Sequence, residues 1–209
     1  MFTVHQCLVI DSGISFVDLA YSSPMKAKTR KRVSKGEWLA LALEVLSVEG
    51  LQGIRVERLA RELKISKSGF YWHFADRSDL LRQLLDYWAY EYTEVVTQNQ
   101  ELLKVSPKVR LNQIASMLRK HNLTKYELSI RAWSAHDPKV AEVVAQVYRQ
   151  RMDYIREVFR QLGFSGDELE MRTALYICYH SWEETIYGGE SERKLARLQK
   201  LRLDLLTSK

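Results

Sequence analysis

Two short helical patterns lie almost back to back in residues 56–80, and this stretch constrains the fold more than any other. The first pattern is an apolar stripe at positions i, i+3, i+4 and i+7, formed by Val56, Leu59, Ala60 and Leu63. Such spacing places the four side chains on one face of a two-turn helix. A second helical pattern begins after only two connecting residues, so the pair has the form of a helix-turn-helix unit.

The second helix is predicted to span Ser66–His73, with the hydroxyl of Ser66 as its N-cap. Only Phe70 and Phe74, one turn apart, are expected to face inward. The outward side chains are small, hydroxyl-bearing, aromatic or basic: Lys67, Ser68, Gly69, Tyr71 and Trp72. Such a face is unsuited to solvent alone, but it suits a helix that is pressed against the phosphates and base edges of a duplex.

The stretch Gly50–Leu80 resembles the DNA-binding signature of the tetracycline-repressor (TetR) family. It carries G-L-x-G, then L-A-R-E-L, I-S-K-S-G-F-Y-W-H-F and D-R-S-D-L with their spacing intact. The resemblance implies an all-α fold, with an N-terminal three-helix helix-turn-helix DNA-binding domain and a C-terminal helical domain for ligand binding and dimerisation. A three-helix packing unit that does not bind DNA is the alternative.

The resemblance also implies roles for individual residues. Lys67, Ser68 and Gly69 would lie near base edges, whereas Tyr71, Trp72, His73 and Arg77 would lie at the phosphate backbone. Ser66, which begins the helix, is counted among the DNA-binding residues. A glycine at position 69 has a physical reason, because any side chain there would hold the helix off the floor of the groove. For His73, a core position with a hydrogen bond to the backbone is the alternative.

Two positions depart from the family pattern. Arg55 stands where the family usually has Thr or Ser, and Lys64 stands where the family has a turn glycine. Without a capping oxygen, the first N–H groups of the helix need water or a phosphate, so we hypothesise that Arg55 contacts a DNA phosphate. Lys64 must adopt a turn conformation that glycine adopts more easily, so we expect local strain or a different turn.

Composition narrows the class of protein. A 46% apolar share in 209 residues is ample for a packed core, and a net charge of +6 suits a polyanionic partner. Cys7 and Cys178 are far apart in sequence, so they indicate neither a disulfide framework nor a metal site, and a cytoplasmic location is expected. No apolar run is long enough for a membrane span. We expect no cofactor and no metal.

Three segments are predicted. Residues 1–33 form a basic, flexible extension, residues 34–80 the DNA-binding domain, and residues 81–209 the effector-binding and dimerisation domain. Within the extension, residues 1–24 have the character of an extended or misassigned start or of a specific addition, because Met25 directly precedes a basic run. That run is either an arm that contacts DNA or a solvated tail.

The remaining chain is predicted to be helical throughout. Ser34 caps a helix to Glu49 that is apolar on most sides, from Trp38 to Val48, and is therefore buried on most sides. The other predicted helices span Arg77–Gln98, Lys108–Lys120, Thr124–His136, Pro138–Leu162, Asp167–Tyr187 and Glu192–Leu206. The Arg77–Gln98 helix would leave the DNA-binding domain and enter the next one as a lever.

Aromatic residues are numerous in the second half. One interpretation is an apolar effector pocket lined by Trp88, Tyr92, Trp133, Tyr148, Tyr176 and His180. Ordinary core and interface packing is the alternative. The family resemblance implies that the last two helices form a dimer interface, for which the candidates are Tyr179, Trp182, Leu195, Leu198, Leu201 and Leu205. These leucines could equally cap the core of their own subunit.

Two other classes of protein were weighed. His180-x-x-Glu183 resembles a fragment of a di-iron site, but its order is reversed and partner motifs are missing, so no catalytic residue is assigned and no enzyme is predicted. A membrane-surface or structural helical protein would not explain residues 56–80. The sequence therefore predicts a homodimeric transcriptional regulator, most simply a repressor that a small-molecule effector releases from a palindromic duplex DNA operator, with no membrane partner.

Overall fold

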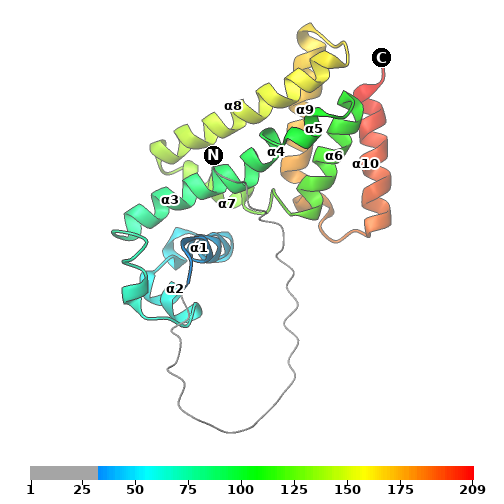
Figure 1. Cartoon of the computed structure of the whole chain (residues 1–209). Coiled ribbons are helices and arrows are strands. Elements are labelled where there is room, and N and C mark those ends of the chain that lie inside the picture. The colour runs from blue at the N-terminus through cyan, green and yellow to red at the C-terminus, as the bar shows by residue number, and fades with distance from the viewer. Residues whose placement is uncertain (1–32) are drawn as a thin grey trace. The chain divides into compact units, whose positions relative to one another are not determined.

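The computed structural model describes residues 33–209, and within them the chain is helical and contains no strand (Figure 1). The predictions for residues 1–32, including the basic run, lie outside the described residues. The helical segments are α1 (Lys35–Glu49), η1 (Leu51–Gly53), α2 (Val56–Glu62), η2 (Lys67–Gly69), α3 (Arg77–Ala89), η3 (Tyr90–Glu94), α4 (Val95–Thr97), α5 (Gln100–Leu103), α6 (Pro107–Lys120), α7 (Glu127–Ser134), α8 (Pro138–Gln161), α9 (Gly166–Tyr187) and α10 (Glu192–Thr207). The all-α prediction is confirmed.

Both ends of α1 are capped, and the N-cap is the predicted Ser34. The Ser34 hydroxyl accepts a hydrogen bond from the Glu37 amide, and the Glu37 carboxylate accepts one from the Ser34 amide at 2.7 Å. Gly50 ends the helix with φ +67°, a left-handed conformation that residues with a Cβ avoid. The helix is buried on most sides, as predicted, but Val48 at its end is 79% exposed and does not belong to the buried face.

The first three elements pack around aromatic rings. Trp38 of α1 contacts Phe70 and Phe74 edge-on, with ring centroids 5.4 and 6.5 Å apart. All three rings are fully buried, together with Leu59 of α2. Phe70 and Phe74 therefore face inward as predicted, and they fix the segment that carries them against α1.

The prediction of one continuous helix over Ser66–His73 is wrong. Only Lys67–Gly69 forms a short 3₁₀ turn, η2, and further turns continue to His73. Ser66 stands at the N-cap position, but its hydroxyl bonds the Ser68 hydroxyl at 2.7 Å and caps no amide. Without that cap, and with a glycine in its first turn, the segment has little intrinsic tendency to be an α-helix.

The lever helix continues through most of its predicted length, but it is not uniform. After Ala89 of α3, five residues form a single π-helical segment, η3, before α4 resumes. Such π segments are rare and frequently occur at functional sites. Asp76 caps the start of α3, because its carboxylate accepts a hydrogen bond from the Asp79 amide at 2.8 Å. The short helices η1 and α5 were not predicted from the sequence.

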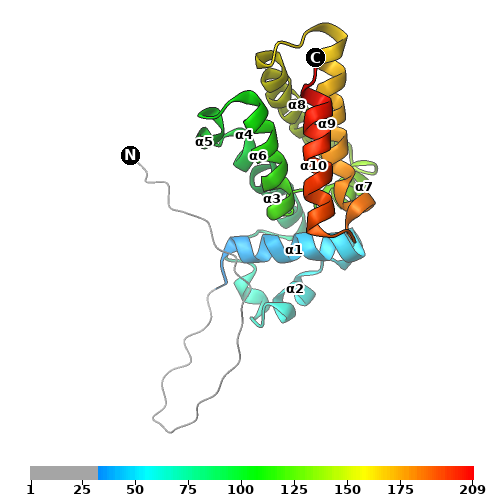
Figure 2. The same cartoon turned by 90° about the vertical axis from the view of Figure 1, so that its right-hand side faces the viewer.

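The last helices pack in antiparallel pairs. α8 lies against α9, and α10 lies beside both α9 and α6 (Figure 2). Their core is a second buried cluster that includes Phe159, Phe164 and Tyr176. Helix α10 turns Gln199 and Leu206 toward this core, whereas Leu201 and Leu205 are 59% and 73% exposed. Pro138 begins α8, as predicted, and Gly163 follows its end with φ +90°.

Lys64 has φ +57°, so the strain expected at this position is present. A side chain in the left-handed region costs about 1–2 kcal/mol, which glycine avoids at an entropic cost of about 0.5–1 kcal/mol. We therefore predict that Lys64→Gly raises the free energy of unfolding by roughly 0.5–1 kcal/mol in urea denaturation. Asn122→Gly is the control, since Asn122 has φ +48° but asparagine tolerates this region. A loss of stability for Lys64→Gly, with Asn122→Gly neutral, would contradict the strain argument.

Candidate functional site

The outward face of the η2 segment is exposed in the way the sequence predicts. Tyr71 and Trp72 are 62% and 85% exposed, although both directly follow the fully buried Phe70. Lys67 and Ser68 are exposed as well, while Gly69 is half-buried. The Tyr71 and Trp72 rings therefore extend into solvent beside the Lys67 ammonium group and the Ser68 hydroxyl. A partner molecule would cover such an exposed apolar surface.

Charge on this face is partly compensated within the chain. Lys67 Nζ lies 2.8 Å from a carboxylate oxygen of Glu57 on α2, and both side chains are more than half exposed. The Lys67 hydrogen bond lowers the pKa of Glu57, so this carboxylate stays ionised. An exposed pair of this kind is weak, and a phosphate can replace Glu57 as the partner of Lys67.

A Cβ atom added at Gly69 would lie 3.0 Å from Cδ1 of Ile65. Packing within the motif is therefore a reason for a glycine here. This contact with Ile65 adds to the approach to a groove floor, which is the reason that the sequence alone indicates.

Three of the predicted phosphate contacts also hold the motif together. Arg77 donates to the carbonyl oxygens of Ile54 and Leu51 at 2.8 and 2.7 Å. The His73 ring donates through Nε2 to the carbonyl of Val33 at 3.0 Å, the backbone role that had been the alternative. Arg55 stands at the uncapped start of α2 and donates to the Gln52 carbonyl at 3.3 Å.

A cavity of about 50 Å³ lies between the helices of the second half. Its walls come from η3, α4, α6, the segment before α7, α8 and α9: Tyr92, Thr93, Val96, Thr97, Ile114, Leu118, Leu123, Thr124, Arg151, Tyr154, Ile155, Tyr176, Ile177, His180 and Ser181. The predicted pocket residues Tyr92, Tyr176 and His180 are among them. Trp88, Trp133 and Tyr148 are not, because they pack in the cluster that extends to α1.

Arg151 joins the cavity to that cluster. Its guanidinium donates to Glu127 Oε1 at 2.7 Å and, through Nε and Nη2, to the Thr93 hydroxyl at 3.0 and 2.8 Å. The same group lies over the rings of Trp88 and Tyr148. Tyr148 donates to the other oxygen of Glu127 at 2.7 Å, and burial, followed by the Glu127 charge, raises the pKa of Tyr148.

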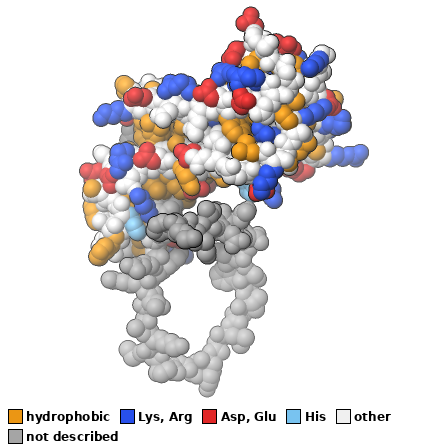
Figure 3. Space-filling view, turned by 45° about the horizontal axis from the view of Figure 1, so that its top comes forward, with side chains coloured by type: hydrophobic (Ala, Val, Ile, Leu, Met, Phe, Trp, Pro, Cys, Tyr) orange, Lys and Arg blue, Asp and Glu red, His pale blue; other side chains and the backbone are white. Residues whose placement is uncertain are grey.

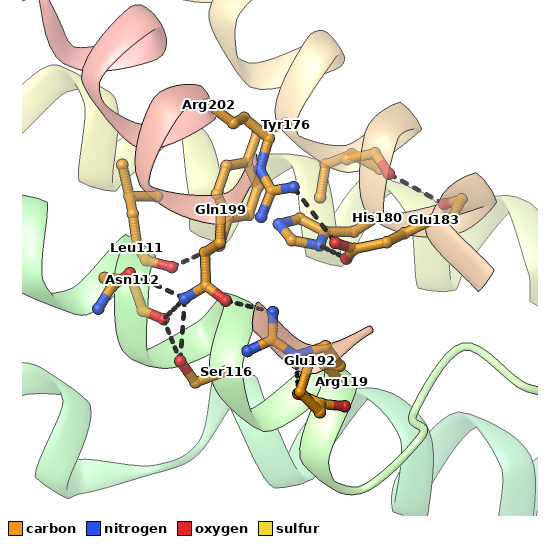
Figure 4. Close-up of polar contacts among 12 residues, drawn as sticks. Leu111, Asn112, Ser116, Arg119, Tyr176, His180, Glu183, Glu192, Gln199 and Arg202 are labelled. Carbon is orange, nitrogen blue, oxygen red and sulfur yellow. Dashed lines mark hydrogen bonds and ion pairs between the residues drawn. The ribbon is translucent and has the colours of Figure 1, made fainter. Parts of the chain in front are cut away.

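His180 belongs to a second polar group at the same cavity (Figure 4). Its Nδ1 lies 3.1 Å from Glu183 Oε2, and the other carboxylate oxygen of Glu183 lies 3.4 Å from Arg202 of α10. Burial lowers the pKa of His180 more than the Glu183 hydrogen bond raises it. Burial alone would raise the pKa of Glu183, but His180 and Arg202 together lower it. The pair is therefore a neutral imidazole beside an ionised carboxylate.

The predicted interface residues lie on or near an exposed apolar surface of α9 and α10. On α9, an exposed stripe follows helical spacing: Met171, Leu175, Cys178, Trp182 and Ile186. On α10, Leu201 and Leu205 are exposed, while Leu195 and Leu198 are half-buried. Tyr179 is half-buried under the guanidinium of Arg202, with 3.9 Å from its carbon to the ring centroid.

Within residues 33–209, no three His, Cys, Asp or Glu side chains are grouped so that they could hold a metal ion. No helix in the same part of the chain is long and apolar enough to cross a membrane. On the face shown in Figure 3, Lys and Arg side chains are interspersed with Asp and Glu rather than gathered into one basic patch.

Comparison with known proteins agrees with the motif. Residues 39–84 match the family model of bacterial regulatory proteins of the tetR family. The chain is 36% identical over 53 residues to the class E tetracycline repressor protein of Escherichia coli, a match that spans 25% of each chain.

Solved structures resemble almost all of the described chain. A transcriptional regulator from Rhodococcus sp. Rha1 is 17% identical, covers 84% of this chain and 94% of its own, and has a TM-score of 0.63. The regulator FadR from Bacillus subtilis, solved in complex with stearoyl-CoA, is 15% identical, covers 84% of this chain and 98% of its own, and has the same TM-score. At these identities the likeness concerns the fold.

The ion pair of Glu127 and Arg151 is buried, with side chains 2% and 13% exposed. Breaking such a pair from one side leaves an uncompensated charge, so Glu127→Gln is predicted to lower the free energy of unfolding by about 3 kcal/mol. Glu101→Gln is the control, because its pair with Lys104 is exposed and contributes little. Urea denaturation measures both, and equal effects of the two substitutions would show that Arg151 does not depend on Glu127.

Proposed function

We propose that this chain, which belongs to the TetR family of bacterial regulatory proteins, is a homodimeric repressor that binds a two-fold symmetric DNA operator and releases it when a small molecule enters the cavity. The observation that carries the proposal is the exposed face of Lys67, Ser68, Tyr71 and Trp72, held outward by the buried Phe70 and Phe74. In this proposal residues 34–80 form the DNA-binding domain, and residues 81–209 form the domain that binds the effector and the second subunit. DNA as the partner implies the cytoplasm as the location.

The DNA contacts follow from position and chemistry. Lys67, Ser68 and Gly69 meet base edges, while Ser66, Tyr71, Trp72 and His73 contact the phosphate backbone. Arg55 and Arg77 supply positive charge next to the uncapped start of α2 and the start of α3. Both arginines also bond carbonyl oxygens, so their guanidinium groups are already oriented before DNA arrives.

A second subunit would cover the apolar surface of α9 and α10. The exposed stripe from Met171 to Ile186 and the leucines 201 and 205 form a continuous candidate for a two-fold interface, in which each subunit presents the same patch. Tyr179, Trp182, Leu195 and Leu198 lie on the same two helices. Two subunits would present their η2 segments to successive major grooves, whose centres are about 34–36 Å apart.

The size of the cavity suggests how an effector acts. An apolar cavity of about 150 Å³ accommodates benzene, so a cavity of about 50 Å³ must widen to hold a ring-sized molecule. One wall is Tyr92 and Thr93 of η3, in the lever that begins at the DNA-binding motif. A ligand that pushes η3 outward would strain the hydrogen bonds between Arg151 and Thr93 and tilt α3. The molecule must bind the widened state better than the closed one, or the equilibrium does not move.

Two substitutions separate positioning from base reading. Tyr71→Ala is predicted to weaken binding to operator and to random duplex alike, whereas Lys67→Ala loses about tenfold or more in operator affinity and much less on random duplex. Affinity for both duplexes should fall steeply with salt, because phosphate contacts release counterions. Leu103→Ala is the control, since Leu103 is exposed on α5, outside residues 34–80 and outside the cavity lining. Equal losses on both duplexes for both variants, or a flat salt response, would contradict the assignment.

The interface has its own test. The double substitution Leu201→Glu, Leu205→Glu is predicted to give monomers in sedimentation velocity, because it would bury four carboxylates at a two-fold contact. Leu103→Glu on α5, where Leu103 is 51% exposed, should leave the sedimentation profile unchanged. A dimer that survives the double substitution would place the contact elsewhere.

A further inference from the structure

We infer that the cavity selects an uncharged, largely apolar molecule with one hydroxyl or N–H group, which donates a hydrogen bond to Nε2 of His180 and has the Tyr154 hydroxyl as its second polar contact. This inference names the class of effector, and it therefore rests on the effector role proposed above. It follows from the apolar walls, the charge balance and two unsatisfied polar atoms of the cavity.

Hydrocarbon side chains supply most of the surface around the cavity. They come from four helices and one connecting segment: Val96, Ile114, Leu118, Leu123, Ile155 and Ile177. Thr97 and Ser181 also line the cavity, but their hydroxyls already donate to carbonyl oxygens within their own helices. Such walls favour a ligand whose surface is mainly apolar.

The described side chains that line the cavity offer an anion no unpaired cation. Arg151 is the only permanently charged side chain among the described residues that line the cavity, and its charge is matched by the buried carboxylate of Glu127. Its Nε and Nη2 groups are also committed, to the Thr93 hydroxyl and to the Tyr92 carbonyl. A carboxylate or phosphate ligand would have to displace Glu127 or lie beside it in a poorly solvated space.

His180 supplies an acceptor. Its Nδ1 faces Glu183, which is also paired with Arg202, so Nδ1 carries the hydrogen. The ring is 4% exposed, and burial keeps it neutral by lowering its pKa. Nε2 then carries a lone pair and no hydrogen. It is a buried atom without a hydrogen-bond partner in the described chain. An acceptor of this kind, at the wall of a cavity, calls for a donor from outside the protein.

Tyr154 supplies the second polar atom. Its hydroxyl is buried and has no hydrogen-bond partner within residues 33–209. Burial raises the pKa of Tyr154, so it remains a hydroxyl that can both donate and accept. A ligand hydroxyl has the chemistry that both sites need, because it can donate to His180 and accept from Tyr154. An ether or a plain hydrocarbon leaves the imidazole nitrogen unsatisfied.

Four probes of similar size test the inference: phenol, anisole, toluene and benzoate. Binding to the full chain is measured by isothermal titration calorimetry, without DNA. Phenol is predicted to bind about tenfold more tightly than anisole, since one additional buried hydrogen bond has about that effect, and more tightly still than toluene, which makes neither hydrogen bond. Benzoate is predicted not to bind. The preference for phenol over toluene should fall in Tyr154→Phe and in His180→Phe, because each substitution removes one of the two hydrogen bonds. It should be kept in Tyr90→Phe, which removes an exposed hydroxyl outside the cavity.

Several outcomes would overturn the inference: benzoate binding more tightly than phenol, toluene matching phenol, or none of the four probes binding. Tyr154→Phe removes one oxygen atom, so the comparison holds even where His180→Phe does not fold. Operator affinity in saturating phenol separates the two proposals. Phenol that binds through both residues but leaves operator affinity unchanged overturns the effector role alone. Normal operator binding with the wrong order of probes overturns only the inference.

Discussion

The packing of Trp38 on Phe70 and Phe74 is the contact on which the rest of the structure depends. The η2 segment is a 3₁₀ turn of three residues, and a piece of helix this short has no stability of its own in water. Its orientation is therefore set by the two phenylalanine rings beneath it. Because those rings are fixed under Trp38, the side chains beside them point into solvent whether or not the backbone is a regular helix. These are Lys67, Ser68, Tyr71 and Trp72.

The same buried cluster links the motif to the second half of the chain. It extends from Val33 through Trp88 of α3 to Val147 of α8, and Tyr126 before α7 donates to Glu44 of α1 at 2.5 Å. Arg151 lies over Trp88 and bonds Thr93, so the cluster ends at the wall of the cavity. In the proposed mechanism a change at η3 would reach α1 through this cluster, because well-packed interiors shift between discrete arrangements rather than deform continuously.

Features that depend only on neighbouring residues in the sequence, such as helix caps, were predictable. The capping box at Ser34, the cap at Asp76, the glycine after α8 and the inward pair Phe70 and Phe74 all follow from short-range chemistry. The 3₁₀ form of η2 and the π segment η3 were missed, because both depend on packing against distant residues. Over three to five residues, the spacing of apolar side chains does not distinguish either form from an α-helix.

The polar residues of the cavity were missed for a different reason. Arg151 lies four residues after Val147 and four before Ile155, on the buried face of α8, and this charged residue in an apolar stripe was a signal that could have been used. Glu127 precedes Ile130 and Trp133 in the same way on α7. Tyr154 gave no signal, since a tyrosine at the edge of an apolar stripe is usual. Trp88, Trp133 and Tyr148 were assigned to the pocket by residue type alone, which does not distinguish a cavity wall from the core behind it.

The central claim is that the face of η2 reads a duplex in two-fold symmetric pairs. Selection of bound fragments from a random duplex library by the full chain tests it most directly. The account predicts enrichment of one sequence with two inverted half-sites, whose centres are about one helical turn, roughly 10–10.5 base pairs, or a multiple of it apart. Recovery of fragments without a shared motif, or of a motif without inverted symmetry, would contradict it.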